Sequence, residues 1–504
     1  MIMNIKQAKQ EIMDTVQAYL MKDEYGEYVI PSIHQRPVLI LGAPGIGKTQ
    51  IMEQAARECK VALVSYTITH HTRQSAIGLP FISKKEYGGR EYSATEYTMS
   101  EIVASIYDKM RDTGLKEGIL FIDEINCVSE TLAPAMLQFL QCKMFGNHEI
   151  PQGWVIVAAG NPPEYNKSVR EFDVVTMDRV KKIEVEPDFA VWKEYAVKNQ
   201  LHPAVISYLS TRTANFYRME TTVDGRTFAT PRGWEDLSQM LVVYEKLGKK
   251  MDREVVRQYI QHEKIAKDFA NYLELYEKYQ MDYQLEAVLR GEIDDALKKK
   301  ASHASFDEKL SVVSLLLSRV RNAFADVLRG QKRIDLLYGQ LKELREGLTE
   351  EGGTNPLAFV KQTTEAFAKE YETKKKAELL TRLEDRIYRD VLGLLEKDVW
   401  DLAQEGSGAE VFEKIRDWFG TLQDQQEQEE TAASQMLEYA FDFMEEVFGS
   451  GQEMVIFVTE LNSDYYTVQF LQQYECERYY RYNRQLLVDE SSQAIEEQLR
   501  QMGR

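Results

Sequence analysis

The stretch that decides the fold is Gly42-Ala43-Pro44-Gly45-Ile46-Gly47-Lys48-Thr49. It follows the pattern Gly-x-x-x-x-Gly-Lys-Thr, the phosphate-binding P-loop. Its three glycines let the backbone turn tightly, so several N–H groups can point at one phosphate chain. Lys48 is expected to neutralise the β- and γ-phosphates, and Thr49 to offer its hydroxyl to Mg²⁺.

The segments on either side of this loop supply the context that the motif needs. Residues 37–41 are apolar and predict a short buried strand, and residues 50–59 predict a helix. The positive end of that helix would face the bound anion. A glycine turn that binds nothing is the alternative, and the complete motif with both flanks disfavours it.

A second apolar strand, predicted over residues 118–122, runs into Asp123 and Glu124. Such a strand buries its apolar side chains and presents two carboxylates at its end, beside the P-loop. Asp123 is expected to hold Mg²⁺ through water, and Glu124 to act as the general base on the attacking water. The alternative is a buried strand that ends in a solvated acidic turn.

Two further polar residues fit a phosphate site. Asn161 follows the predicted strand 154–159 and is expected to bind the γ-phosphate or the attacking water, although the two prolines after it also fit a simple turn. Arg232 lies in the first turn of a helix predicted to begin at Pro231. A cation there opposes the helix dipole, so Arg232 requires an anionic partner, either a phosphate or the nearby Glu235 or Asp236.

Composition limits the class of protein. The chain has 504 residues, which predicts two or three domains, and a net charge of −19 that argues against broad nucleic-acid binding. We expect no membrane segment and no signal peptide, because neither pattern is found. The four cysteines are scattered, as is typical of reduced thiols in a cytoplasmic protein.

The pattern of elements predicts three domains. Residues 1–188 alternate strands and helices, with a hairpin expected over 78–97, and residues 189–283 read as a helical lid. Residues 284–504 are predicted to be mainly helical, with one strand at 454–458. The cations and tyrosines of 478–484 fit either a packed helix or stacking on nucleic-acid bases.

Taken in this order, the motifs resemble those of AAA+ ATPases, most closely the MoxR and dynein-related branch. The resemblance covers residues 1–283 and includes the P-loop, Ser75 to Pro80, Ile122 to Asn126, Ala159 to Glu164, Asp178-Arg179 and Thr230 to Arg232. It implies an α/β fold with a five-stranded parallel sheet, a helical lid, and ATP with Mg²⁺ as ligands. It also implies an insert before the strand 118–122, fitted by 78–97, and a hairpin before Asn161, fitted by 142–151. The long tail after residue 283 is not covered.

The resemblance also implies function and assembly. Members form rings, usually hexamers, and use ATP to remodel other proteins, often with a von Willebrand factor A-type partner. Arg179 stands at the position of the family's arginine finger, and Arg170 is a second candidate. The first hypothesis is therefore a MoxR-like remodelling ATPase whose tail binds the client. A DNA-directed, restriction-type NTPase and a non-hydrolysing nucleotide-dependent scaffold are the alternatives.

Overall fold

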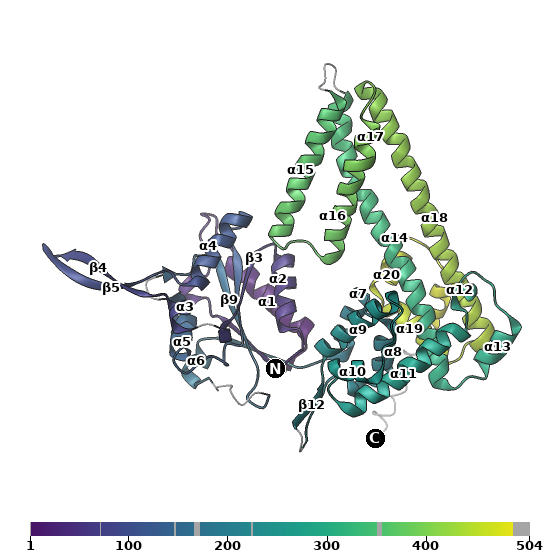
Figure 1. Ribbon diagram of the computed structural model, residues 1–504, viewed down its shortest axis with the longest axis horizontal. Coiled ribbons are helices and arrows are strands. Elements are labelled where there is room, and N and C mark those ends of the chain that lie inside the picture. Colours follow the sequence, from purple (N-terminus) through teal and green to yellow (C-terminus); the bar gives the residue numbers. More distant parts are fainter. Residues whose placement is uncertain are drawn as a thin grey trace, which may run out of the picture. The chain divides into compact units, whose positions relative to one another are not determined.

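The computed structural model describes residues 2–70, 72–145, 148–165, 172–222, 225–349 and 355–486. The chain divides into two compact units (Figure 1). The first contains Met1–Val191 together with Ala368–Asp385, and the second contains Trp192–Phe367 together with Arg386–Arg504.

The first unit is built on a parallel sheet. Its strands lie in the order β1 (Ile2–Met3), β10 (Lys181–Val185), β2 (Val38–Gly42), β9 (Trp154–Gly160), β6 (Gly118–Asp123) and β3 (Ala62–Thr67). The central strands are almost wholly apolar because helices cover both faces of a parallel sheet. The expected five-stranded parallel sheet is confirmed, and β1 adds a short sixth strand that the sequence analysis did not predict.

Helices and short turns connect these strands. They are α1 (Ile5–Leu20), η1 (Ser32–His34), α2 (Lys48–Cys59), η2 (Ile68–His70), α3 (Arg73–Ile77), α4 (Glu101–Thr113), α5 (Ala133–Cys142) and α6 (Val174–Asp178). Local sequence sets where they begin: Asn4 and Gln7 form a capping box at the start of α1, and Ser100 caps α4.

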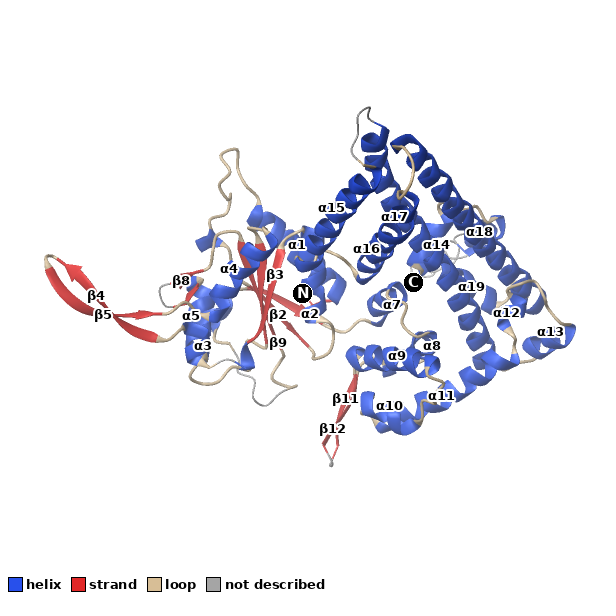
Figure 2. Cartoon of the chain, turned by 45° about the horizontal axis from the view of Figure 1, so that its top comes forward, coloured by secondary structure: helices blue, strands red, loops and turns tan. Residues whose placement is uncertain are grey.

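The hairpin expected over 78–97 and the hairpin that the resemblance implies over 142–151 are both present. Strands β4 (Pro80–Tyr87) and β5 (Arg90–Tyr97) pair antiparallel and extend away from the sheet (Figure 2). Gly88 and Gly89 both adopt positive φ, 59° and 77°, as the tight turn between these strands requires. Strands β7 (Met144–Phe145) and β8 (His148–Glu149) form the second, much shorter hairpin.

The second unit is helical apart from one hairpin, β11 (Arg218–Thr222) with β12 (Gly225–Ala229). Its first helices are α7 (Phe189–Lys198), α8 (Pro203–Thr211), η3 (Thr213–Asn215), α9 (Pro231–Lys246), α10 (Arg253–Tyr259), α11 (Glu263–Asp282), α12 (Leu285–Val288) and α13 (Asp295–Ser302). The later ones are α14 (Phe306–Thr349), α15 (Pro356–Lys376), α16 (Arg382–Leu394), a π-helical stretch (Leu395–Val399), α17 (Trp400–Leu402), α18 (Gly408–Phe448), α19 (Gln452–Ser463) and α20 (Tyr465–Leu471). The end of α15 and the start of α16 fall within Ala368–Asp385 and so belong to the first unit. Within the described parts of the chain, no helix combines the length and apolarity that crossing a membrane requires.

Two segments of the tail, 454–458 and 478–484, test the predictions made for it from the sequence. The strand expected at 454–458 is wrong, since these residues lie in α19. Their buried side chains, Met454, Phe457, Val458 and Leu461, follow the helical spacing i, i+3, i+4, i+7. The packed-helix interpretation of 478–484 is confirmed, because Arg478 is ion-paired with Asp442 and Glu438 of α18.

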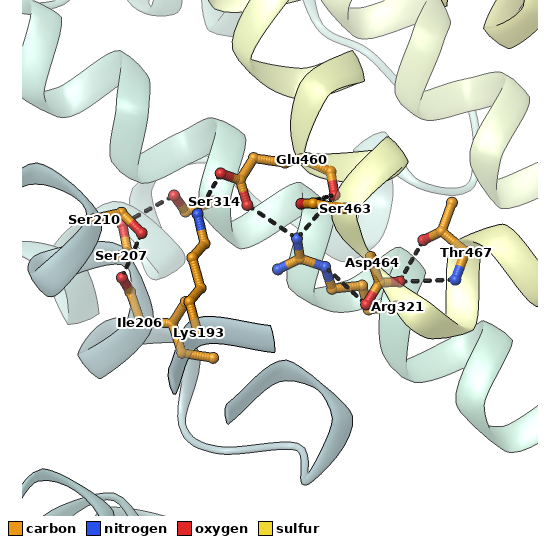
Figure 3. Close-up of polar contacts among 10 residues, drawn as sticks. All are labelled: Lys193, Ile206, Ser207, Ser210, Ser314, Arg321, Glu460, Ser463, Asp464 and Thr467. Carbon is orange, nitrogen blue, oxygen red and sulfur yellow. Dashed lines mark hydrogen bonds and ion pairs between the residues drawn. The ribbon is translucent and has the colours of Figure 1, made fainter. Parts of the chain in front are cut away.

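Charged side chains join the expected lid helices to the tail helices within the second unit (Figure 3). Glu460 of α19 accepts hydrogen bonds from Lys193 of α7 and, at 3.1 Å, from Arg321 of α14. Asp464 caps α20 through Thr467 and lies 3.6 Å from Arg321. Two cations and two carboxylates therefore balance each other where three segments distant in sequence meet.

The neighbouring charges also decide the ionisation of Glu460. Burial alone would raise the pKa of its carboxyl. The positive charges of Lys193 and Arg321 and their hydrogen bonds outweigh that effect, so the pKa lies below its ordinary value. Glu460 is thus held as a carboxylate, the form that this network needs.

We expect Arg321→Met to loosen α19 and α20. Breaking a buried charge pair on one side leaves the partner charges uncompensated, at a cost of about 3–5 kcal/mol. Hydrogen exchange of the α19 and α20 amides should accelerate by roughly 10²-fold or more. Arg319→Met is the matched control on the same helix: Arg319 is 40% exposed, against 13% for Arg321, and its pair with Glu286 is a surface pair. Equal exchange in both variants would contradict a structural role for the network.

Candidate functional site

The P-loop has a backbone that only glycine adopts easily. It lies between the end of β2 at Gly42 and the start of α2 at Lys48. Gly45 and Gly47 have φ of 76° and 94°, in the left-handed region. At Gly42 the reason is space, because a Cβ there would lie 2.7 Å from the carbonyl oxygen of Val185. The loop therefore keeps the open concave backbone that a phosphate chain requires.

Lys48 is held inside this loop. Its side-chain nitrogen donates to the carbonyl oxygens of Gly42 and Ala43, each at 2.8 Å, and to Oδ1 of Asn161 at 2.9 Å. The residue is only 8% exposed. Asn161 stands just beyond β9, the neighbour of β2 in the sheet, so the structure brings these two predicted residues into direct contact.

Thr49 and Asp123 also meet, as the sequence predicted. The Thr49 hydroxyl donates to Oδ2 of Asp123 at 2.9 Å. Both groups are partly buried at the carboxyl end of the parallel sheet, where ligands bind in open α/β folds. Mg²⁺ prefers such oxygen ligands, usually one or two protein groups with water and phosphate in the other positions. The donor set therefore fits Mg²⁺.

Glu124 adopts a conformation that is uncommon for its residue type. Its φ is 56°, in the left-handed region that non-glycine residues seldom occupy. Its backbone N–H donates to Oδ1 of Asp123 at 2.9 Å, and its Oε2 accepts from the Thr69 hydroxyl at 3.1 Å. Backbone strain of this kind gathers at functional sites, where the surroundings hold it in place.

Sequence reasoning gave no role to two residues of this group, Thr69 and Asn126, although Asn126 ends the quoted motif Ile122 to Asn126. Thr69 holds the Glu124 carboxylate, and the buried Asn126 donates from Nδ2 to the carbonyl oxygen of Asn161 at 2.7 Å. A signal for Thr69 was present, because it closely follows the apolar run Val61 to Val64, which is typical of a buried strand. Nothing in the sequence alone shows that the Asn126 amide reaches the next strand.

Three arginines were also predicted to act at the phosphates. Arg179 is exposed and caps the C-terminal end of α6 just before β10. Arg170 lies outside the described residues. Arg232 belongs to the second unit, in the first turn of α9, which Thr230 caps as expected. Burial, with Glu235, raises the pKa of Asp236, and the charge of Arg232 partly offsets that rise. Roles for these arginines at phosphates remain proposals.

Comparison with known families identifies this arrangement. Residues 37–180, which carry the P-loop, both acidic residues and Asn161, match the family described as AAA domain (dynein-related subfamily). Residues 37–180 are an AAA domain. It is a P-loop NTPase fold, and ATPase activity is the general property of the family. The MoxR and dynein-related resemblance noted from the motifs is thereby confirmed for the dynein-related AAA branch.

Similar solved structures include two mutants of RuvB from Thermotoga maritima. A proline-to-glycine mutant is 15% identical, covers 51% of this chain and 69% of its own, and has a TM-score of 0.30. A lysine-to-arginine mutant is 15% identical, covers 57% and 76%, and has a TM-score of 0.28. No curated protein matches the chain.

In the AAA domain, ATP binding and ATP hydrolysis are expected to depend on different side chains. Glu124→Gln should keep ATP binding, because the P-loop is untouched, and should lower hydrolysis by about 10²–10⁴-fold, because the water loses its base. Lys48→Ala should lose binding as well, since it removes the cation inside the loop. Fluorescent-nucleotide titration and phosphate release measure the two properties. Equal hydrolysis by Glu124→Gln and wild type would refute Glu124 as the base.

Proposed function

We propose that this protein is a MoxR-like ATPase that hydrolyses ATP within a ring and uses the energy to remodel a protein client. The observation that supports this most directly is the convergence of Lys48, Thr49, Asp123, Glu124 and Asn161 at one edge of the sheet. A cation, two groups suited to Mg²⁺, a carboxylate base and a polar amide are the parts that phosphoryl transfer to water requires.

Each side chain has a distinct task in the proposed reaction. Lys48 exchanges its carbonyl partners for phosphate oxygens, and Asn161, its present neighbour, orients the attacking water or the γ-phosphate. Thr49 and Asp123 hold Mg²⁺, directly or through water. Bound Mg²⁺ neutralises charge that develops on the phosphates. Glu124, once its carboxylate leaves the Thr69 hydroxyl, accepts the proton of the attacking water.

A neighbouring subunit is proposed to complete the site. Charge that builds on the γ-phosphate needs a further cation, and an arginine finger is worth about 10³–10⁵ in rate. Arg179 is exposed and stands immediately before the β10 segment. We propose that it reaches the ATP of the adjacent subunit in a homo-oligomer, most simply a hexamer, while Arg232 contacts the phosphates from the subunit's own lid.

Mixing two inactive variants tests the shared site. Arg179→Ala should bind ATP normally and hydrolyse it poorly, and Glu124→Gln should do the same for a different reason. Their mixture should regain turnover, because some interfaces pair an intact Glu124 with an intact Arg179. The matched control replaces Glu124→Gln by the double variant Glu124→Gln/Arg179→Ala, which supplies no intact arginine and should restore nothing. Unimpaired turnover by Arg179→Ala alone would refute a finger at this position.

The tail is proposed to recruit the client through a von Willebrand factor A-type partner. This part of the proposal rests on the long helices α14 and α18, which have 44 and 41 residues. The two helices lie side by side. Gln426 of α18 donates to the Val327 carbonyl at 3.0 Å, and Gln331 of α14 donates to Glu430 at 3.1 Å. Removing residues 284–504 would be a poor test, because Lys193 and Ser207 bond to residues of that segment.

Site-specific photo-crosslinking tests client recruitment in the intact protein. A photoreactive phenylalanine analogue can replace one exposed tyrosine at a time in the Glu124→Gln background: Tyr338 on α14, Tyr87 on the β4–β5 hairpin, and Tyr25 before η1 as the control. We expect crosslinks to a co-expressed client or von Willebrand factor A-type partner from Tyr338 and none from Tyr25. Crosslinks from Tyr87 alone would move client binding to the hairpin and refute the tail.

A DNA-directed NTPase is less well supported. The net charge is −19, and the most promising cations of the tail, Arg478 and Arg481, are paired with carboxylates of α18. A purely structural nucleotide scaffold is opposed by the complete set of hydrolytic groups around Glu124. Neither alternative is favoured by a specific contact among the described residues.

A further inference from the structure

The side chain of Asn126 links two loops of the nucleotide site. It stands two residues after Glu124, is only 4% exposed, and donates from Nδ2 to the carbonyl oxygen of Asn161 at 2.7 Å. We propose that Asn126 is a positioning residue that fixes Asn161 and Glu124 relative to each other for hydrolysis. This inference rests on the proposed ATPase function and names a residue that the proposed mechanism does not use.

The space beside Asn126 shows that this contact is built into the fold. Gly160, the last residue of β9, lies so close that a Cβ added there would be 2.6 Å from Oδ1 of Asn126. The φ of Gly160 is not in the left-handed region, so the requirement for glycine there is one of space. The amide of Asn126 fills the place that a side chain at residue 160 would take.

The orientation of the amide follows from its neighbours. With Nδ2 toward Asn161, a donor faces a carbonyl oxygen. The reversed amide would set Oδ1 against that same oxygen, and two acceptors repel. Asn126 therefore acts as a donor here, and its loss would leave the Asn161 carbonyl without this partner.

The contact extends in both directions to reacting groups. The amide oxygen of Asn161 accepts from Lys48 at 2.9 Å, which connects Asn126 to the P-loop through one residue. On the other side, the N–H of Ile125 donates to the Ala159 carbonyl at 2.9 Å, which fixes the turn that carries Glu124 in its left-handed conformation. Asn126 and Ile125 thus tie this turn to the Asn161 segment at two points.

A double-mutant cycle tests the assignment. Asn126→Ala removes the donor, and Gly160→Ala forces the amide out of its place, so each should lower kcat by about 10²-fold, the cost of a displacement of roughly 1 Å. The ATP Kd should change less than about 3-fold, because the P-loop is intact. The double variant should be no slower than Asn126→Ala alone, since both changes break the same contact. Multiplied losses in the double variant would overturn the inference.

Two further variants separate positioning from general stability. Asn126→Leu keeps a branched side chain of similar shape, removes the donor and adds no charge, so it should show the same loss of kcat even if Asn126→Ala folds poorly. Val128→Ala is the matched control: Val128 is buried close by in the chain and belongs to the core cluster of the sheet. It should lower the melting temperature and leave kcat unchanged.

The possible results distinguish a failure of the Asn126 positioning role from a failure of the proposed ATPase activity. A wild-type protein that binds ATP and releases no phosphate refutes the ATPase proposal, and the positioning role falls with it. A wild type that turns over ATP, beside Asn126→Ala and Asn126→Leu variants with unchanged kcat, refutes the positioning role alone.

Discussion

The burial of the Lys48 ammonium is the constraint on which the nucleotide site depends. A charged group that is 8% exposed must have its hydrogen-bond capacity met, and two P-loop carbonyls and the Asn161 amide meet it. These partners come from the end of β2 and from the segment after β9. The bond to Asn161 forms because β2 and β9 are neighbours in the sheet, so the pairing of these strands completes the site around the ammonium.

The same sheet edge also carries the strained residue. Glu124 holds a left-handed backbone although it has a side chain, and such a conformation persists only where the surroundings determine it. Two features hold this conformation. Ile125, the next residue, is buried and donates to the Ala159 carbonyl, and the N–H of Glu124 donates to Asp123. As a result the Glu124 carboxylate is separated from the Asp123 carboxylate, and the two can serve different purposes. Asp123 stays beside Thr49, where Mg²⁺ is proposed to bind, and Glu124 is free to act on the attacking water.

The sequence predicted those parts of the structure that depend on short-range patterns. The P-loop, the strand before Asp123 and the strand before Asn161 each combine an apolar run with a polar end, and all three are found. The segment 454–458 was misread because five residues rich in β-branched and large apolar side chains fit a strand and a buried helix equally well. Thr69 and Asn126 were missed because their partners lie 55 and 35 residues away, and only the paired strands bring them together.

The contact between the proposed lid helices and the tail helices also depends on residues far apart in the sequence. Lys193, Arg321, Glu460 and Asp464 come from segments far apart in the sequence, and none of them stands out there as more than a surface charge. Once partly or fully buried, each requires an opposite charge at a fixed position, so a shift in helix register would separate cation from carboxylate. Apolar contacts between the same helices tolerate such a shift much better. The charges therefore favour one arrangement of α7, α14 and α19, in which α7 of the proposed lid is fixed to helices of the tail.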